Sequence, residues 1–427
     1  MTRVAYLLHR FPGITDTFIK REIRSLQKAG TDVRVISVWK PRGAETTAEI
    51  MSDWQADTQF VLPRPALSIL TALVACAVRS PARLALTARL ALSTARPGLR
   101  GLLFQLYYFV EAVLAADLLR CSGAKHVHNH IGDHSGIITM LAARLAGIGY
   151  SITFHGWPVF FDAEASRVKE KVLAAQFTRS ISYFCRSQLM MFSASEDPAQ
   201  FKVVHCGLTI DNYQFRTPRE KVERLFCAAR LSPEKGHLFS LQALKILHDR
   251  GCRLELRLAG DGPARRRLEH LSRELGIADH VRFLGNLSER EVAEELQAAD
   301  LFLLSSFVEG IPVSAMEAMA VGVPVIATNV AGTSELIEDG RTGLLVRPSD
   351  PQALADAIAR MMQDHPFRLR VAQLGRQKVV DEFDVDKETA RLNGYLLQSC
   401  SGPEPVRVMV PPERLTAPTS PPDRATF

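Results

Sequence analysis

Two carboxylates eight positions apart frame a predicted loop-to-helix junction in the C-terminal half of the chain. The segment 309–317 reads EGIPVSAME, which places Glu309 before the helix and Glu317 about one turn inside it. Pro312 suits the first helical turn, where its missing N–H costs nothing and the other N–H groups are free to hold an anion such as phosphate. Carboxylates beside a phosphate repel the ligand unless they bind its hydroxyls. The arrangement therefore indicates a ligand with phosphates in the middle and hydroxyls at both ends, as in a nucleotide sugar.

Two cations follow the first predicted strand of the same half. Arg230 and Lys235 lie in the segment ARLSPEKG, which leads from that strand into a helix. Arginine can bind a phosphate through two N–H groups and lysine as a point charge, so the pair suits a diphosphate leaving group. Taken alone, the two residues would be solvated loop charges. Because the Glu309 segment lies in the same half, we favour the functional interpretation.

Histidines at predicted strand ends are candidates in the first half of the chain. His155 could hydrogen-bond a transferring sugar or stabilise developing charge. The segment 126–134, HVHNHIGDH, could bind zinc, because alternate histidines of a strand share a face. No thiol ligand lies near, so we expect His130 and Asp133 to line the acceptor side of a cleft, with no metal at the site.

The turn after the first predicted strand is expected to face the same cleft. It reads FPGITDTF, and we expect Gly13 to contact the donor and Thr15 the acceptor. Thr15 or Asp16 is also predicted to cap the helix that follows.

Short apolar strands alternate with amphipathic helices along the chain, which predicts parallel sheets covered on both faces. The first series of predicted strands comprises residues 4–9, 32–38, 126–130, 150–154, 181–184 and 201–205. The second series comprises residues 225–229, 254–259, 281–284, 300–304, 323–327 and 343–346. Ligands of such sheets bind beyond the carboxyl ends of the strands. We therefore expect an α/β protein of two doubly wound, Rossmann-like domains that face each other across a cleft.

These two series set the predicted domain boundaries. The chain divides into a first domain, a linker, a second domain, a final helix and a tail, at residues 1–206, 207–221, 222–385, 386–400 and 401–427. Asp384 is expected to cap the final helix rather than bind a metal. Seven prolines and few apolar residues predict a disordered tail.

The composition is that of an ordinary globular protein. An apolar share of 47% in 427 residues allows two or three domains with full cores. Seven scattered cysteines form no C-x-x-C pair, which favours reduced thiols and a cytoplasmic location. We see no secretory signal before the first strand, and the longest apolar run, residues 66–78, is too short to span a bilayer as a helix.

A basic helical insertion over residues 64–110 interrupts the first domain. Between residues 61 and 110 there are six arginines and no acid, which equals the whole net charge of +6. The segment is rich in alanine and leucine, so it could attach to an anionic surface at the inner face of the cell membrane. The alternative is a helical insertion packed on the domain, with arginines that extend into water.

Taken together, these motifs resemble the retaining glycosyltransferases of the GT-B fold in family 4, also called group 1. The resemblance covers about residues 224–385 and rests on the segments ARLSPEKG, LAGDG, VRFLG, SSFVEGIPVSAMEA, GVPVIAT, TSELIEDG and GLLV. In the first domain, RFPGITDTFI and SYFCRSQL resemble members that build bacterial exopolysaccharides such as colanic acid.

The resemblance implies catalytic roles for four positions. Arg230 and Lys235 would bind the donor diphosphate. Glu309 would hold hydroxyls of the donor sugar, and His155 would touch the transferring sugar.

It also implies the contacts of the donor. Glu317 would hold the ribose hydroxyls, and the base would lie against the loop from Gly285 to Leu287. Backbone N–H groups would come from the turn that comprises Gly310, Ile311, Pro312 and Val313. Many relatives carry a Gly-Gly pair in the first loop, where this chain has only Gly13. The final helix of such enzymes usually crosses back to the first domain.

The implied reaction transfers a sugar from a nucleotide diphosphate donor, expected to be a UDP-sugar, to a hydroxyl with retained configuration. No carboxylate is placed as a covalent nucleophile, so we expect front-face displacement in which the leaving phosphate accepts the acceptor's proton. The expected acceptor is a lipid-linked oligosaccharide at the membrane, and no cofactor or nucleic-acid partner is expected. Two alternatives stay open: a sugar-nucleotide epimerase of the same fold, and a non-catalytic sugar-nucleotide-binding subunit.

Overall fold

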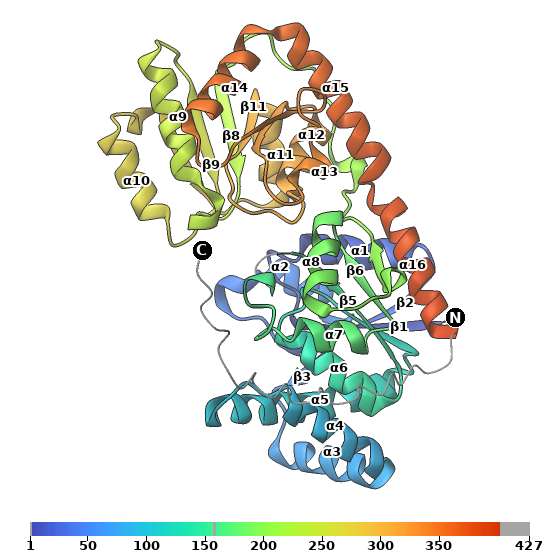
Figure 1. The fold of residues 1–427 in the computed structure, drawn as a ribbon. Helices are drawn as coiled ribbons and strands as arrows, with labels where there is room; N and C mark the ends of the chain where they lie inside the picture. The colour runs from blue at the N-terminus through green and yellow to red at the C-terminus, as the bar shows by residue number, and fades with distance from the viewer. Residues whose placement is uncertain (1, 157–158, 402–427) are drawn as a thin grey trace, which may run out of the picture.

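The computed structural model describes residues 2–156 and 159–401, which form two α/β domains (Figure 1). The first domain has a seven-stranded sheet in the order β3-β2-β1-β4-β5-β6-β7, in which all neighbours are parallel. Its strands are β1 (Arg3–Arg10), β2 (Asp32–Trp39), β3 (Thr58–Leu62), β4 (His126–Asn129), β5 (Gly149–Phe154), β6 (Phe177–Ser180) and β7 (Phe201–Val203). Its helices are α1 (Thr17–Lys28), α2 (Ala48–Gln55), α3 (Ala66–Arg79), α4 (Pro81–Ser93), α5 (Leu99–Ser122), α6 (His134–Ala146), α7 (Val168–Ala174) and α8 (Tyr183–Ser193).

The second domain repeats this architecture around a six-stranded parallel sheet in the order β10-β9-β8-β11-β12-β13. Its strands are β8 (Arg224–Ala228), β9 (Glu255–Ala259), β10 (Val281–Gly285), β11 (Leu301–Leu304), β12 (Val325–Thr328) and β13 (Leu344–Val346). Its helices are α9 (His237–Asp249), α10 (Arg265–Glu274), α11 (Glu289–Ala298), α12 (Val313–Val321), α13 (Thr333–Leu336), α14 (Pro351–Gln363) and α15 (His365–Glu382). The prediction of two parallel-sheet α/β domains is confirmed.

Two details of the first sheet differ from the sequence prediction. The strand predicted at 181–184 is wrong, because β6 ends at Ser180 and Ser182 caps α8. The Ser182 hydroxyl accepts a hydrogen bond from the N–H of Cys185 at 3.0 Å, and such a cap outweighs the β propensity of the aromatic residues that follow. The edge strand β3 was not predicted, since five residues are too few to separate a strand period from a helical one.

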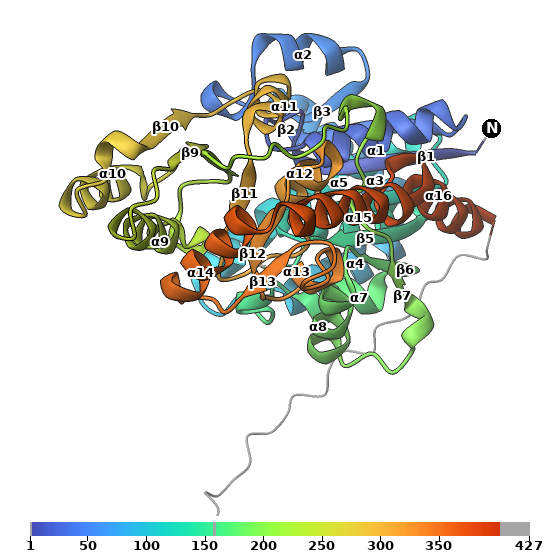
Figure 2. The same ribbon diagram turned by 90° about the horizontal axis from the view of Figure 1, so that it is seen from above.

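The final helix α16 (Val385–Ser401) packs on the first domain although it follows the second along the chain (Figure 2). Its first turn is capped by the Asp384 carboxylate, which accepts from the N–H groups of Asp386 and Lys387 at 2.9 and 3.0 Å. Leu392 and Leu396 are buried in the apolar cluster that includes α1 and β1. The tail predicted at 401–427 lies outside the described residues from 402 onward.

The insertion forms three helices, α3 to α5, at the end of the first domain that points away from the second (Figure 1). In the part of the chain that the structure describes, α5 is the one unbroken helix long and apolar enough to cross a membrane. Its most apolar stretch is 44% buried, and α5 packs along α6, as a core helix would.

Candidate active site between the two domains

A cavity of about 360 Å³ lies between the domains, at the carboxyl ends of strands from both sheets. The first domain contributes Phe18, His155, Ile181 and Cys206. The second contributes Arg230, Glu234, Lys235, Val308, Glu309, Gly310, Ile311 and Val313. Parallel α/β sheets bind ligands at this edge, so the location fits a substrate site. Seven residues named from the sequence meet here, four of them charged or titratable: His155, Arg230, Lys235, Glu309, Gly310, Ile311 and Val313.

Lys235 and Glu309 form the charged centre of this cavity. The Lys235 ammonium donates to Glu309 Oε1 at 2.7 Å, and the Ser306 hydroxyl donates to the same oxygen at 2.6 Å. The loop that carries Lys235 reaches Glu309 because Gly236 allows this loop to lie against the end of β11. A Cβ at Gly236 would sit 2.1 Å from the Ser305 carbonyl oxygen. Arg230 is exposed at the cavity wall, which leaves its guanidinium accessible to a ligand.

Glycines bring the two domains together beside this ion pair. A Cβ at Gly310 would lie 2.6 Å from the His155 carbonyl oxygen of the other domain. Gly332 approaches Gly310 even more closely from within the second domain, since its Cβ would meet the Gly310 carbonyl oxygen at 1.8 Å. Contacts this short are possible only without a side chain. The backbone of the Glu309 segment is therefore held between two neighbouring loops.

The helix that follows this segment, α12, begins at Val313 with Pro312 as its N-cap. The N–H groups of its first turn have no partner inside the helix, and Val313, its first residue, lines the cavity. Pro312 itself is not among the residues that line the cavity. Such a terminus favours an anion through its aligned N–H groups and its dipole.

Glu317 lies outside the cavity lining and bonds to groups from elsewhere in the chain. Its Oε1 accepts a hydrogen bond from the Tyr213 hydroxyl at 2.8 Å and another from Arg21 at 3.1 Å. Arg21 belongs to α1 of the first domain, so this ion pair joins the domains. Only 8% of the Arg21 side chain is exposed, and its Nε and one terminal nitrogen have no hydrogen-bond partner among the described residues.

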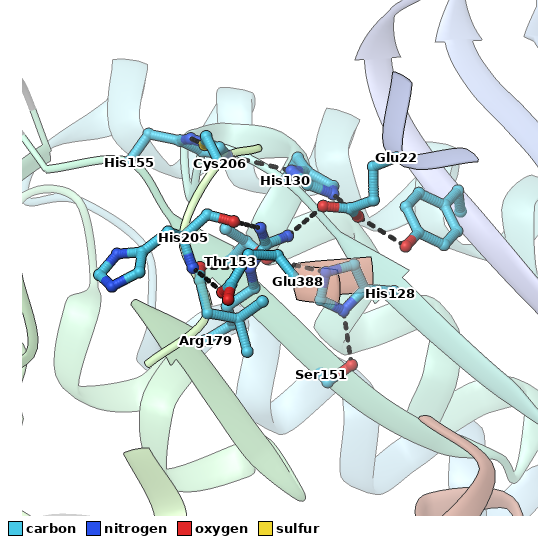
Figure 3. Close-up of polar contacts among 12 residues, drawn as sticks. Glu22, His128, His130, Ser151, Thr153, His155, Arg179, His205, Cys206 and Glu388 are labelled. Atoms are coloured by element: carbon cyan, nitrogen blue, oxygen red, sulfur yellow. Dashed lines mark hydrogen bonds and ion pairs between the residues drawn. The ribbon is translucent and has the colours of Figure 1, made fainter. Parts of the chain in front are cut away.

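A buried chain of hydrogen bonds stands behind the cavity (Figure 3). Glu22 accepts from the Tyr6 hydroxyl at 2.7 Å and pairs with Arg179 through its second oxygen. His130 Nε2 lies 2.9 Å from Glu22, and His130 Nδ1 lies 3.0 Å from His155 Nε2. The chain ends in the cavity, where Cys206 Sγ lies 3.8 Å from His155 Nδ1.

The protonation states along this chain follow from its charges. Burial opposes ionisation of Glu22, but the Arg179 guanidinium and His130 hold the pKa of Glu22 well below its ordinary value. Burial lowers the pKa of His155 well below 6.5 and raises that of Cys206 to about 11, so the imidazole is neutral and the thiol protonated. In the tautomer in which a neutral His130 donates Nε2–H to the Glu22 carboxylate, His155 donates Nε2–H to His130 Nδ1 and can accept from the Cys206 thiol at Nδ1. Both ring nitrogens of His155 therefore have protein partners.

The remaining histidines of β4 belong to the core. His126 Nε2 and His128 Nδ1 each lie 2.7 Å from the Ser151 hydroxyl, and His128 Nε2 lies 2.8 Å from Thr153. Glu22, His128 and His130 are near enough to share one ion, but all of their side-chain nitrogens and oxygens have protein partners and Arg179 adds a positive charge. The geometry thus favours a hydrogen-bonded core over a cation site.

Other residues expected at the site lie around the cavity rather than in its wall. The N–H of Gly13 donates to the Asp16 carboxylate at 2.7 Å, and this bond replaces the helix cap expected of Asp16. Thr15 is exposed. Gly285 ends β10, which is an edge strand of the second sheet, and Leu287 follows two residues later.

Asp133 lies outside the interdomain cavity. Its carboxylate accepts from the N–H and hydroxyl of Ser135 at 2.8 and 2.6 Å, and its residue lines a separate cavity of the first domain.

Several residues of the site were missed by the sequence analysis. Phe18 packs against the His155 ring with centroids 4.6 Å apart, and Cys206 contacts the same ring. Glu22 and Arg179 form the buried ion pair that anchors the series of hydrogen bonds behind the His155 ring. The one available signal was position, since Cys206 falls where a strand ends at the domain boundary.

Comparison with known proteins gives a family for the second domain. Residues 210–378 match the family model described as Glycosyl transferases group 1. WcaL of Salmonella typhimurium, named for colanic acid biosynthesis, is 35% identical over 197 residues that cover 44% of this chain and 48% of WcaL. The amylovoran biosynthesis glycosyltransferase AmsK of Erwinia amylovora is 34% identical over 179 residues, 40% of this chain and 44% of AmsK. This chain spans about half the length of the curated relatives it matches.

Solved structures resemble nearly the whole chain. A glycosyltransferase of Rickettsia africae ESF-5 superposes with a TM-score of 0.70 at 16% identity, over 94% of this chain and all of that one (100%). HepE of Anabaena, in complex with UDP and glucose, gives a TM-score of 0.70 at 17% identity over 93% of this chain and 100% of HepE. These likenesses show that the fold is GT-B.

Proposed function

We propose that this chain, whose second domain belongs to the glycosyl transferases group 1, moves a sugar from a nucleotide diphosphate to a hydroxyl in exopolysaccharide synthesis, with retained configuration. The observation that carries this proposal is the interdomain cavity, which gathers Arg230, Lys235 and Glu309 beside the N-terminus of α12. Two cations and a helix terminus suit a diphosphate, and a carboxylate suits sugar hydroxyls. The names of WcaL and AmsK support the role in exopolysaccharide synthesis.

In the proposed reaction, the bond between C1 of the sugar and its phosphate oxygen breaks as the acceptor oxygen bonds to the same face of C1. The acceptor's hydroxyl proton passes to the departing phosphate oxygen, and the nucleoside diphosphate leaves. Lys235 and Arg230 stabilise the charge that grows on the diphosphate, and each such prearranged donor is typically worth about 3–4 kcal/mol. Glu309, fixed by Lys235 and Ser306, orients the sugar. We propose that these cations supply the charge stabilisation without a divalent metal.

The donor is proposed to be a UDP-sugar. The complexes of HepE with UDP and glucose support this choice. A mannosyltransferase of Mycobacterium tuberculosis that is 32% identical over 177 residues is named as GDP-mannose-dependent. GDP-sugars are therefore the competing donors against which UDP-sugars must be tested. A screen of nucleotide sugars for a rise in Tm should select UDP-sugars, because a ligand that binds only the native state stabilises it. Stabilisation by GDP-sugars alone would contradict the proposal.

The acceptor is proposed to be a lipid-linked oligosaccharide, reached from the cytoplasmic face of the membrane. The insertion supports this, since α3 exposes Leu67 at 72%, Leu70 at 57%, Val74 at 54% and Val78 at 76%. These residues recur at helical spacing and lie beside arginines with no acid in the segment 61–110, which suits an anionic lipid surface. The protein should sediment with phosphatidylglycerol vesicles at low salt but not with phosphatidylcholine, and Leu70→Asp/Val74→Asp should abolish this. Equal sedimentation of the double variant would contradict membrane contact.

The decisive experiment is product analysis. Purified protein, a UDP-sugar selected by the Tm screen and a bacterial glycolipid extract should yield UDP and a glycosylated lipid, whose anomeric configuration by NMR should match that of the donor. An inverted product would contradict retention. Epimerisation of the donor without acceptor would favour the epimerase alternative, and calorimetric binding without turnover would favour a binding subunit.

A further inference from the structure

A second cavity, of about 330 Å³, lies wholly within the first domain. It is bounded by the turn between α4 and α5, by the start of α6 and by the segment that leads into α7. The charged side chains at its wall are three cations and one carboxylate: Arg96, Arg167, Lys171 and Asp133. An excess of positive charge in a concave site favours an anionic ligand.

The two arginines tie the opposite walls of this cavity to each other. Arg96 crosses to the Ala165 carbonyl oxygen, with donor distances of 3.3 and 3.1 Å. Arg167 crosses in the other direction, to the carbonyl oxygens of Thr94 at 3.0 Å and Ala95 at 2.8 Å. These acceptors are neutral, and Arg167 also forms an ion pair with the Glu170 carboxylate at 3.5 Å. Within the described residues Arg96 has no ion-pair partner, so its charge is available to a ligand.

Lys171 adds a buried cation on the inner wall. Its ammonium donates to the carbonyl oxygens of Gly132 and Asp133 at 2.6 and 2.7 Å, which uses two of its three N–H groups. The Asp133 carboxylate is turned toward Ser135, so it forms no hydrogen bond with Lys171. Burial lowers the pKa of Lys171 to about 7, and an anion in the cavity would keep it protonated.

The cavity also opens toward the apolar surface of the insertion. Phe104 and Tyr108 of α5 line it, and the Tyr108 ring stacks on His134 at 5.7 Å with an interplanar angle of 18°. Phe104 is 49% exposed, and the neighbouring Leu103 and Leu99 on the same helix are 58% and 73% exposed. A ligand with its anionic group in the cavity could thus extend an apolar chain along α5.

We infer that this cavity binds the phosphate or diphosphate group of the lipid-linked acceptor, with the apolar chain of the lipid against the exposed face of α5. The inference rests on the proposed function, since it assigns the acceptor of that reaction. The loop after β4 connects the two sites: Lys171 fixes this loop at Gly132 and Asp133, and His130 of the same loop bonds to His155 in the donor cavity. A sugar attached to the bound diphosphate would extend toward the donor along this loop.

Farnesyl diphosphate is a soluble probe of this assignment. Calorimetry should show that it binds at least tenfold more tightly than inorganic pyrophosphate, which lacks the chain, and than farnesol, which lacks the charge. Arg96→Ala should weaken farnesyl diphosphate binding at least tenfold. Lys171→Met should weaken binding to the same extent if this variant folds. If it does not fold, Arg96→Ala still provides the test, because Arg96 is an exposed residue. Arg89→Ala removes an equal charge from the insertion outside the cavity and should leave binding unchanged.

Three results would overturn the inference. The first is equal binding of pyrophosphate and farnesyl diphosphate, and the second is equal weakening by the Arg89 and Arg96 substitutions. The third is loss of adhesion to phosphatidylglycerol vesicles in Arg96→Ala with farnesyl diphosphate binding intact, which would assign the cavity to a membrane headgroup. The rise in Tm caused by UDP should be the same in Arg96→Ala and wild type. Absence of that rise in wild type would count against the proposed donor alone, because the farnesyl diphosphate measurement does not depend on it.

Discussion

Replacing Lys235 with alanine should lower kcat by about two to three orders of magnitude. The Lys235 ammonium lines the interdomain cavity and contacts Glu309 at 2.7 Å, so it stands where a leaving diphosphate would gain charge. Loss of one prearranged donor to a developing charge costs about 3–4 kcal/mol, and about 1.4 kcal/mol corresponds to a tenfold change in rate. The two figures together give roughly a 10²–10³-fold loss.

The same substitution should cost little stability. The Lys235 side chain is 22% exposed and that of Glu309 is 10% exposed, so solvent screens part of their attraction. After the change, Glu309 keeps the hydrogen bond from Ser306 at 2.6 Å. A partly exposed pair of this kind contributes about 0.2–1 kcal/mol, which corresponds to a fall in Tm of no more than about 4 °C.

Steady-state kinetics and thermal unfolding of the same preparations separate these effects. The control is Lys245→Ala, since Lys245 pairs with Asp249 on the surface of α9 at 2.5 Å and does not line the cavity. It should leave kcat unchanged. A Lys235→Ala protein with kcat within about threefold of wild type would refute the assigned role, because threefold is less than 1 kcal/mol.

Three further predictions test other parts of the site. Gly310→Ala should lower kcat/KM more than tenfold, because its Cβ would lie 2.6 Å from a carbonyl oxygen of the other domain, whereas Gly394→Ala, with nothing within 4 Å, should not. Arg21→Ala should raise the KM for the nucleotide-sugar donor about tenfold, because Glu317, which is expected to hold the ribose hydroxyls, loses a hydrogen-bond partner at 3.1 Å. An unchanged KM would contradict this. Burial lowers the pKa of His126 from 6.5 to about 3, so the unfolded chain binds a proton that the folded chain does not between these values. Stability should therefore fall as pH drops from 6.5 to 5, by about 2 kcal/mol for this group, as measured by urea midpoints, and His126→Leu should reduce the slope.

The donor half of the site was predictable because its chemistry lies in continuous segments. Glu309, Gly310 and Val313 occupy one loop-to-helix junction, and Arg230 and Lys235 occupy another. Each junction follows a short apolar strand, so the rule that strand ends face the ligand places both at one edge of the sheet. That the two loops contact each other depends on strand order, since β8 and β11 are neighbours although β9 and β10 separate them along the chain.

The partners of the first-domain histidines were not predictable, because they come from elements that are distant along the chain and become neighbours only in the fold. Glu22 lies on the buried side of α1, and Arg179 lies in β6, 157 residues away. A buried glutamate in an amphipathic helix looks like any surface carboxylate in the sequence, because its burial depends on which strand the helix covers. The hydrogen-bond partners of the β4 histidines were hidden in the same way: spacing puts His126 and His128 on one face, but Ser151 and Thr153, which bond to them, belong to the next strand.

The series of hydrogen bonds from Glu22 to Cys206 restricts the contacts that His155 can make with a sugar. Its Nε2–H is committed to His130, which Glu22 holds in one tautomer, so rotation of the ring would leave buried polar groups unpaired at about 1–3 kcal/mol. Its Nδ1 instead faces the thiol of Cys206, a weak donor at 3.8 Å that also lines the cavity. A sugar hydroxyl can replace that thiol as the donor to Nδ1 at little cost. His155 would then act as a fixed hydrogen-bond acceptor for the transferring sugar, held neutral by burial, rather than as a proton donor or a cation.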